Sequence, residues 1–226
     1  TRGPYLLEET GSSDVGLYLV ATSKRLFTYS AGSYTAPSDY VATLVKSGSG
    51  ASEIFTLSES DTGNVYIFGG FNASVPAHDR GKLLERTTRE YQEQGLSGIA
   101  YSYSATTGYL SQVTTADPQG WSIDYTYYTS GTESGRLEKI EVENGSATVI
   151  QKVEYTYYGN VTSPSTDIGS AGDLVQVKVS KLASDGTNWT VRYTQYRYHT
   201  GTTGTRDGST HQVKMVLESD AIERIN

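Results

Sequence analysis

The sequence predicts an all-β fold built from sequential antiparallel β-hairpins. Three observations lead to this prediction: a Gly-x-Leu motif recurs from residue 81 onward, a Tyr-x-Tyr motif follows each of its first four copies, and turn-forming residues lie between the two motifs. Around most copies of the second motif, apolar or aromatic residues alternate with polar ones, which is the period-two pattern of a strand. Each repeat unit is therefore predicted to be one hairpin.

The Gly-x-Leu motif opens each unit. Its copies lie 27, 27 and 37 residues apart, and the last interval contains an insertion. In the last three copies an apolar β-branched residue returns three positions after the leucine, whereas Arg86 holds that place in the first. A fifth unit, His211-Gln212-Val213, fits the same pattern without the glycine. The units are expected to start near Gly81, Gly108, Gly135, Gly172 and His211.

The opening glycine predicts a sharp turn, because glycine reaches backbone angles that a Cβ atom excludes. The step from Leu137 to Ile140 spans three residues. An odd step changes face in a regular strand, so a bulge or a late turn is expected between these two residues.

The Tyr-x-Tyr motif ends the second strand of each unit, as in Ile99, Tyr101 and Tyr103, which alternate with small polar residues and alanine. We expect one aromatic face that packs as core, since a binding platform needs no repetition over four units. The alternative is an exposed stacking platform for sugars or a protein partner. Six tyrosines are predicted to form one mostly buried stripe: Tyr101, Tyr103, Tyr125, Tyr127, Tyr155 and Tyr157.

Turn signals separate the two strands of a unit. They are Asp117-Pro118-Gln119-Gly120, Glu143-Asn144-Gly145 and Asp185-Gly186-Thr187. Asn, Asp and Gly tolerate the positive φ that tight hairpins require. Before these regular units, residues 1–80 are interpreted as a lead-in β region with irregular repeats, and residues 81–226 as the regular hairpins.

Composition limits what the chain can bind. A net charge of −7 and a pI near 5.0 argue against a nucleic-acid surface, which needs clustered Lys and Arg. The 226 residues contain no cysteine and no long apolar run, so no disulfide, thiolate metal site or membrane span is expected. The polar residues from Thr1 onward predict no signal peptide there. With 19 Tyr against 4 Phe and 2 Trp, much of the buried surface should come from rings that carry a hydroxyl.

No catalytic, cofactor-binding or metal-binding residue is predicted. The three histidines, His78, His199 and His211, have neither a Cys partner nor a short His-x-x-x-His spacing. A glycosidase needs two facing carboxylates, but most acidic residues alternate with apolar neighbours, as on the solvated face of a sheet. Such residues include Glu138, Glu141, Glu143 and Glu154. The chain is therefore predicted not to be an enzyme.

The paired Gly-x-Leu and Tyr-x-Tyr motifs resemble those of the RHS/YD-repeat family, from about Leu26 to Ile225. The resemblance extends to the lead-in strands, such as Glu53-Ile54-Phe55-Thr56-Leu57. The chain departs from the family where an aspartate should follow the second tyrosine. The residues at that position are Ser104, Tyr128, Tyr158 and His199.

The resemblance implies a curved or spiralling sheet in a large, secreted or cell-surface, toxin-associated protein. On this interpretation the chain is a non-enzymatic shell, stalk, filament or spacer that needs no cofactor. Its expected partners are neighbouring repeats of the parent protein, or other copies of itself, through edge strands. The alternative is a carbohydrate or cell-surface recognition module that uses exposed tyrosines and two inserted loops, 160–171 and 200–210.

Overall fold

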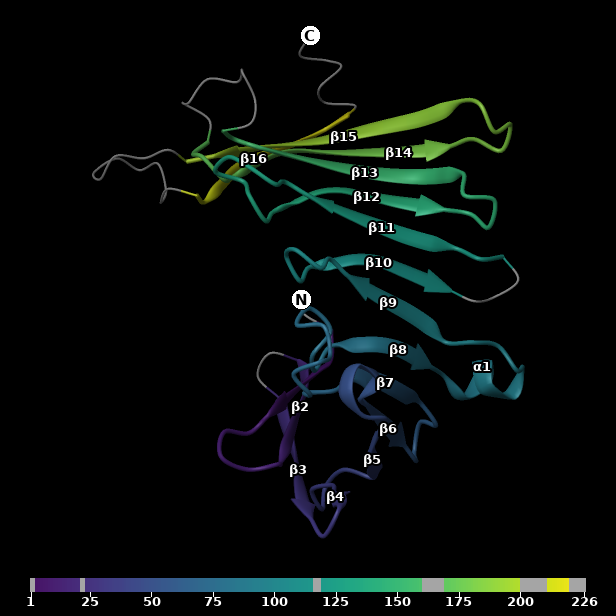
Figure 1. Cartoon of the computed structure of the whole chain (residues 1–226). Coiled ribbons are helices and arrows are strands. Elements are labelled where there is room, and N and C mark those ends of the chain that lie inside the picture. The colour runs from purple at the N-terminus through teal and green to yellow at the C-terminus, as the bar shows by residue number, and fades with distance from the viewer. Residues whose placement is uncertain (1–2, 21–22, 116–118, 160–168, 200–210, 220–226) are drawn as a thin grey trace. The chain divides into compact units, whose positions relative to one another are not determined.

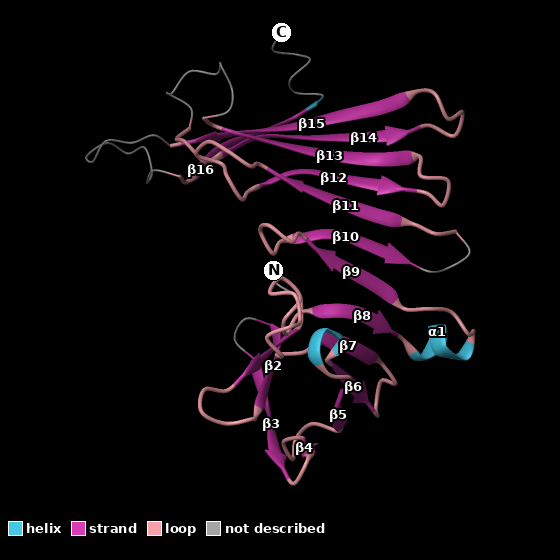
Figure 2. Cartoon of the chain, viewed as in Figure 1, coloured by secondary structure: helices cyan, strands magenta, loops and turns pink. Residues whose placement is uncertain are grey.

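The computed structural model describes residues 3–20, 23–115, 119–159, 169–199 and 211–219. Strands make up 53% of the structure and helices 5%, and the strands form antiparallel sheets of consecutive hairpins (Figures 1 and 2). This arrangement confirms the predicted fold class. The chain divides into two compact units, residues 1–121 and 122–226, which are described separately. The predicted boundary at residues 80 and 81 concerns the start of the regular repeats and stays a prediction.

The first unit contains a four-stranded sheet and six further strands that pair in chain order. The sheet consists of β1 (Tyr5–Glu8), β2 (Val15–Val20), β3 (Ser23–Ser30) and β4 (Ser33–Thr35). The strands after it are β5 (Ala42–Ser47), β6 (Ile54–Glu59), β7 (Val65–Gly69), β8 (Leu83–Thr87), β9 (Ile99–Tyr103) and β10 (Leu110–Thr115). Two short helices interrupt them, η1 (Gly50–Ser52) and α1 (Arg89–Glu93), and the Thr88 hydroxyl caps α1 by accepting from the Tyr91 amide.

The core of the first unit lies in the lead-in region, and phenylalanine and leucine dominate it. Phe27 and Phe68 are fully buried, and Phe55 contacts both Tyr34 and Phe71 edge-on or tilted. The prediction that tyrosine rings would supply much of the buried surface is wrong here. Buried hydroxyls need partners, whereas Phe and Leu need none. The largest fully buried side chains of the described residues are Phe27, Phe55, Phe68, Leu6, Leu17, Leu57, Glu133 and Val15.

The second unit is an antiparallel meander in which each strand pairs with the next. Its strands are β11 (Ser122–Tyr127), β12 (Leu137–Glu143), β13 (Val149–Tyr157), β14 (Leu174–Leu182), β15 (Trp189–Tyr198) and β16 (Val213–Glu218). Its buried hydrophobic cluster is small and consists of Tyr158, Val175 and Tyr198. Most other side chains of these strands are half-buried.

The predicted turns fall where the strands end, with one difference in detail. In the turn after β14, Gly186 has a φ of 71°, and the Asp185 carboxylate accepts from the Thr187 and Asn188 amides at 2.9 and 3.0 Å. In the turn after β12, the left-handed residue is Ala147, with a φ of 55°, rather than Gly145. Residues 116–118 lie outside the described residues, so the turn expected at Asp117-Pro118 is not placed.

The six tyrosines of the expected stripe share a face within each hairpin but are less buried than predicted. Tyr101, for example, is opposite Val113, and Tyr125 is opposite Ile140. All six are half-buried and none is fully buried. The prediction of a mostly buried stripe is therefore wrong in degree, because the strands that carry these residues have little buried apolar surface packed against them.

Candidate functional site

One junction geometry recurs wherever an aromatic strand end turns into a Gly-x-Leu strand. The last aromatic residue of the first strand is always opposite the leucine, or its valine equivalent, of the next. This equivalence confirms the predicted correspondence of Leu110, Leu137 and Leu174. The five pairs are Phe68 with Leu83, Tyr103 with Leu110, Tyr127 with Leu137, Tyr157 with Leu174, and Tyr198 with Val213.

A β-bulge follows each of these pairs. The register slips by one residue on the Gly-x-Leu strand, so that Ile140 is opposite Tyr125 while Leu137 is opposite Tyr127. A three-residue step on one strand is thereby matched to a two-residue step on the other, and both apolar residues stay on the tyrosine face. The bulge expected between Leu137 and Ile140 is confirmed.

The opening residue of each unit has left-handed backbone angles. The φ values are 66° at Gly81, 68° at Gly108, 83° at Gly135 and 90° at Gly172. His211 takes the equivalent place with a φ of 69°. The predicted reason for glycine is therefore confirmed, and the last unit bears backbone strain that the others avoid.

The residue after Tyr-x-Tyr closes the junction with its main chain. The Tyr128 amide donates to the Arg136 carbonyl at 3.0 Å, and the Tyr128 carbonyl accepts from the Gly135 amide at 2.8 Å. Ser104 and Tyr158 make the same two contacts. Since only backbone atoms take part, the fold does not require an aspartate side chain at this position.

A side-chain contact that the sequence did not predict reinforces two units. The Tyr103 hydroxyl donates to the Leu83 carbonyl at 2.8 Å, and the Tyr157 hydroxyl donates to the Leu137 carbonyl at 3.0 Å. In both, the basic residue of the Gly-x-Leu motif lies against the ring: Lys82 Nζ is 4.5 Å and Arg136 Cζ 5.4 Å from the centroid. We call this arrangement the tyrosine clasp. The equal spacing of Leu83 to Tyr103 and Leu137 to Tyr157 is the signal that could have revealed it.

Removing one hydroxyl should show how much the tyrosine clasp stabilises the fold. We expect Tyr157→Phe to lower the free energy of unfolding by about 0.5–1.5 kcal/mol, the net value of one hydrogen bond. Tyr193→Phe is the matched control, because Tyr193 is 37% exposed and none of the hydrogen bonds among the described residues involves its hydroxyl. Urea unfolding followed by circular dichroism gives both values. Equal losses in the two variants would contradict a role for the hydroxyl.

The tyrosine clasp also predicts alkaline sensitivity. Burial raises the pKa of Tyr103 to about 12, above the usual value of 10.0. The stabilisation from the neutral hydroxyl is complete below pH 10 and is lost as the pH rises from 10 through 12, because the unfolded chain ionises first. Between pH 8 and 11, the stability of the wild type should therefore fall more than that of Tyr103→Phe. A constant difference across that range would contradict this assignment.

The histidines do not converge on one site. His78 Nε2 lies 3.6 Å from Asp79 Oδ2, and His211 Nδ1 lies 2.8 Å from Asp173 Oδ1. Among the residues that the structure describes, no group of three or more His, Cys, Asp or Glu side chains could hold a metal ion. None of the described helices is long and apolar enough to cross a membrane.

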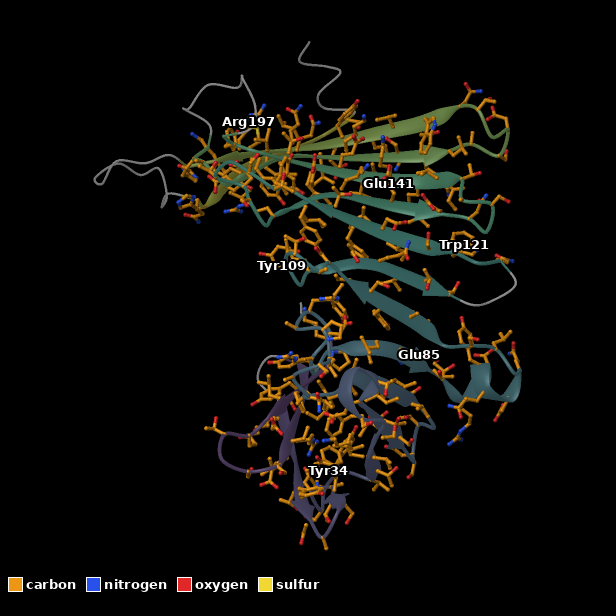
Figure 3. All side chains as sticks on the ribbon, in the orientation of Figure 1. Tyr34, Glu85, Tyr109, Trp121, Glu141 and Arg197 are labelled. Carbon is orange, nitrogen blue, oxygen red and sulfur yellow. The ribbon has the colours of Figure 1, made fainter. Side chains whose placement is uncertain are left out.

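Acidic residues of the second unit form ion pairs within strands β12 and β13 and between β13 and β14. Lys139 pairs with Glu141 at 2.7 Å, and Glu154 pairs with both Lys178, at 3.1 Å, and Lys152, at 3.5 Å. By their strand register, these residues lie on the face opposite Tyr155 and Tyr157. Figure 3 labels one of them, Glu141. Opposite charges across strands stabilise a sheet, so this face has a structural explanation.

Four carboxylates are buried among the described residues, and the sequence predicted none of them: Glu53, Glu59, Glu133 and Asp173. Burial opposes ionisation of Glu53, but Lys46 at 3.0 Å and the amides of Phe71 and Asn72 outweigh it and lower its pKa. Glu59 accepts from the hydroxyls of Tyr40, Thr62 and Tyr66. Glu133 is fully buried and accepts from Thr132 at 2.6 Å. Glu53 and Glu59 hold loops and turns of the first unit, and their hydrogen bonds use both oxygens.

An apolar stripe is exposed on β15. Trp189, Val191 and Tyr193 alternate along the strand, share the face of Lys178 and are 41%, 38% and 37% exposed. This exposed stripe fits the recognition alternative. The inserted loop 200–210 lies outside the described residues, as does 160–171 except for its last three residues.

The fold and its repeated junctions define a class: an all-β protein of consecutive hairpins. No family model matches the sequence, and no curated protein matches it. Among solved structures, the chain is similar to one described as the crystal structure of TcdB2-TccC3-TEV, with 16% identity and a TM-score of 0.34. The alignment covers 94% of this chain and 11% of that one. The chain thus spans a small part of the length of this structural neighbour.

Proposed function

We propose that the chain is a non-enzymatic structural segment of the RHS/YD-repeat type, acting as a shell, stalk, filament or spacer within a larger protein. The fivefold junction supports this proposal best. Every motif residue has a role in joining one hairpin to the next: the positive-φ glycine, the leucine before the bulge, and the tyrosine opposite it. A repeat whose motif residues hold neighbouring strands together is typical of a scaffold.

The resemblance of the motifs to those of the RHS/YD-repeat family also suggests where the segment acts. The segment belongs to a secreted or cell-surface, toxin-associated protein and assembles through its sheet edges with neighbouring repeats or with other copies. Nucleic acid is not a partner in this proposal, since the net charge is −7.

Sedimentation velocity across a concentration series tests the assembly part of the proposal. A segment with unpaired edge strands should form larger species as concentration rises, because unpaired backbone groups accept further strands. Contacts between the two ends of copies are heterologous, so the product is a filament if the rotation does not close a ring. A monomer at every concentration, with β16 protected from hydrogen exchange, would contradict assembly through the edges.

The exposed stripe on β15 supports carbohydrate or cell-surface recognition as a second candidate. Aromatic side chains that are half in water suit stacking against planar surfaces of a ligand. A glycan array with the wild type, Trp189→Ala and Tyr193→Ala separates the two functions. The structural proposal expects no binding that depends on these residues, whereas recognition expects a signal that both substitutions abolish.

A further inference from the structure

The last described strand opens a repeat unit that has no second strand among the described residues. His211 and Val213 begin this unit with the same left-handed angle and the same pairing as the other junctions. In the described part of the chain, β16 pairs with β15 alone. Val213, Met215 and Val216 are consequently 49%, 49% and 50% exposed.

The three units whose strand pairing is fully described follow one register. In the first strand of a unit, the residue three positions after the leucine is opposite a β-branched residue of the second strand. The second tyrosine of the motif lies four residues after that β-branched residue. The opposed pairs are Arg86 with Ile99, Ile140 with Val153, and Val177 with Thr194, and the tyrosines are Tyr103, Tyr157 and Tyr198. In two of these units the hydroxyl of the second tyrosine, Tyr103 or Tyr157, donates to the carbonyl of the leucine that opens the unit.

We propose that the outer edge of β16 is a docking site for an antiparallel strand with the pattern β-branched-x-Tyr-x-Tyr. The β-branched residue is opposite Val216, and the hydroxyl of the last tyrosine hydrogen-bonds the Val213 backbone. This inference rests on the proposed function and names its partner. Main-chain hydrogen bonds provide the affinity of an added strand, and its side chains provide the specificity.

The occupant is a strand from another polypeptide segment rather than an existing strand of a second copy. The strands of this chain with the required pattern include β9, β13 and β15, and each of these already pairs on both edges. A second copy would have to open a hairpin to offer one of them. A further repeat unit of the same kind supplies such a strand without that loss.

A synthetic peptide with the sequence of β13, residues 149–157, serves as the probe against the full chain. We expect it to slow amide hydrogen exchange in residues 213–218. A peptide whose last tyrosine is replaced by phenylalanine should bind about two- to tenfold more weakly, the factor that one hydrogen bond gives. A peptide with both tyrosines replaced by serine, and a scrambled peptide, should give no protection. Equal binding of the phenylalanine peptide, or protection at another strand, would overturn the proposal.

A pair of protein variants locates the site independently. Val216→Lys places a charge at the edge position opposite the incoming strand and should abolish binding, as edge lysines oppose strand addition. Val191→Lys is the control, since Val191 is also exposed but lies on β15 away from the proposed edge, and it should leave affinity unchanged. Circular dichroism checks that both variants are folded. The peptide series uses the unaltered chain, so it decides the matter even if Val216→Lys unfolds.

The peptide experiments and the glycan array can fail independently of each other. Loss of peptide binding with a silent glycan array removes only this docking site. A glycan signal that depends on Trp189 and Tyr193 challenges the structural role, whatever the peptide does.

Discussion

Gly81→Ala should lower the free energy of unfolding of the first unit by about 2–5 kcal/mol. A left-handed φ of 66° is unfavourable for alanine by about 1–2 kcal/mol. The added Cβ would also lie 2.2 Å from the Leu6 carbonyl oxygen and 3.0 Å from the Phe71 ring. Relief requires β1 to move, yet Leu6 is part of the buried core, so overpacking adds about 1–3 kcal/mol. Urea unfolding followed by circular dichroism measures the loss.

Gly32→Ala is the matched control in the same unit. Gly32 has a φ of 88°, but a Cβ there would meet nothing within 4 Å. Only the backbone penalty of about 1–2 kcal/mol should remain. If the two glycine variants lost the same stability, close packing of the junction against β1 would not be the reason for glycine at position 81.

Phe68→Ala should destabilise the first unit by about 3–5 kcal/mol, the usual range for a fully buried ring. Phe68 has no exposed surface and is opposite Leu83 at the first junction. Tyr125→Ala should have a smaller effect of about 1–2 kcal/mol, because Tyr125 is only half-buried. If the Tyr125 ring were fully packed, Tyr125→Ala would lower the free energy of unfolding as much as Phe68→Ala.

Since the chain has two compact units, hydrogen exchange should report each of them separately. Phe68→Ala should speed exchange in β6 to β8, whereas Tyr125→Ala should speed it in β11 to β13. A loss for Tyr125→Ala below about 0.5 kcal/mol would favour the exposed platform over a packed face.

The hairpin units after residue 81, the order of their strands and their junctions follow from the sequence alone. These depend on local chemistry: period-two alternation sets the faces, glycine permits a left-handed angle, and an odd step between Leu137 and Ile140 requires a bulge. The main-chain contacts that close each junction follow once these angles are set. For that reason the repeat could be read at Gly81, Gly108, Gly135 and Gly172 without a structure.

The folded structure was needed to show which residues form the core and which side chains meet across a hairpin. Periodicity identifies a face but not whether another layer covers it, so the tyrosines were expected to be more buried than they are. The Phe and Leu core of the first unit arises from strands distant in sequence, such as those that hold Leu6, Phe27 and Phe68. The Tyr157 hydroxyl likewise reaches the Leu137 carbonyl across the hairpin. Such contacts depend on the packing of whole strands, which single-sequence patterns do not specify.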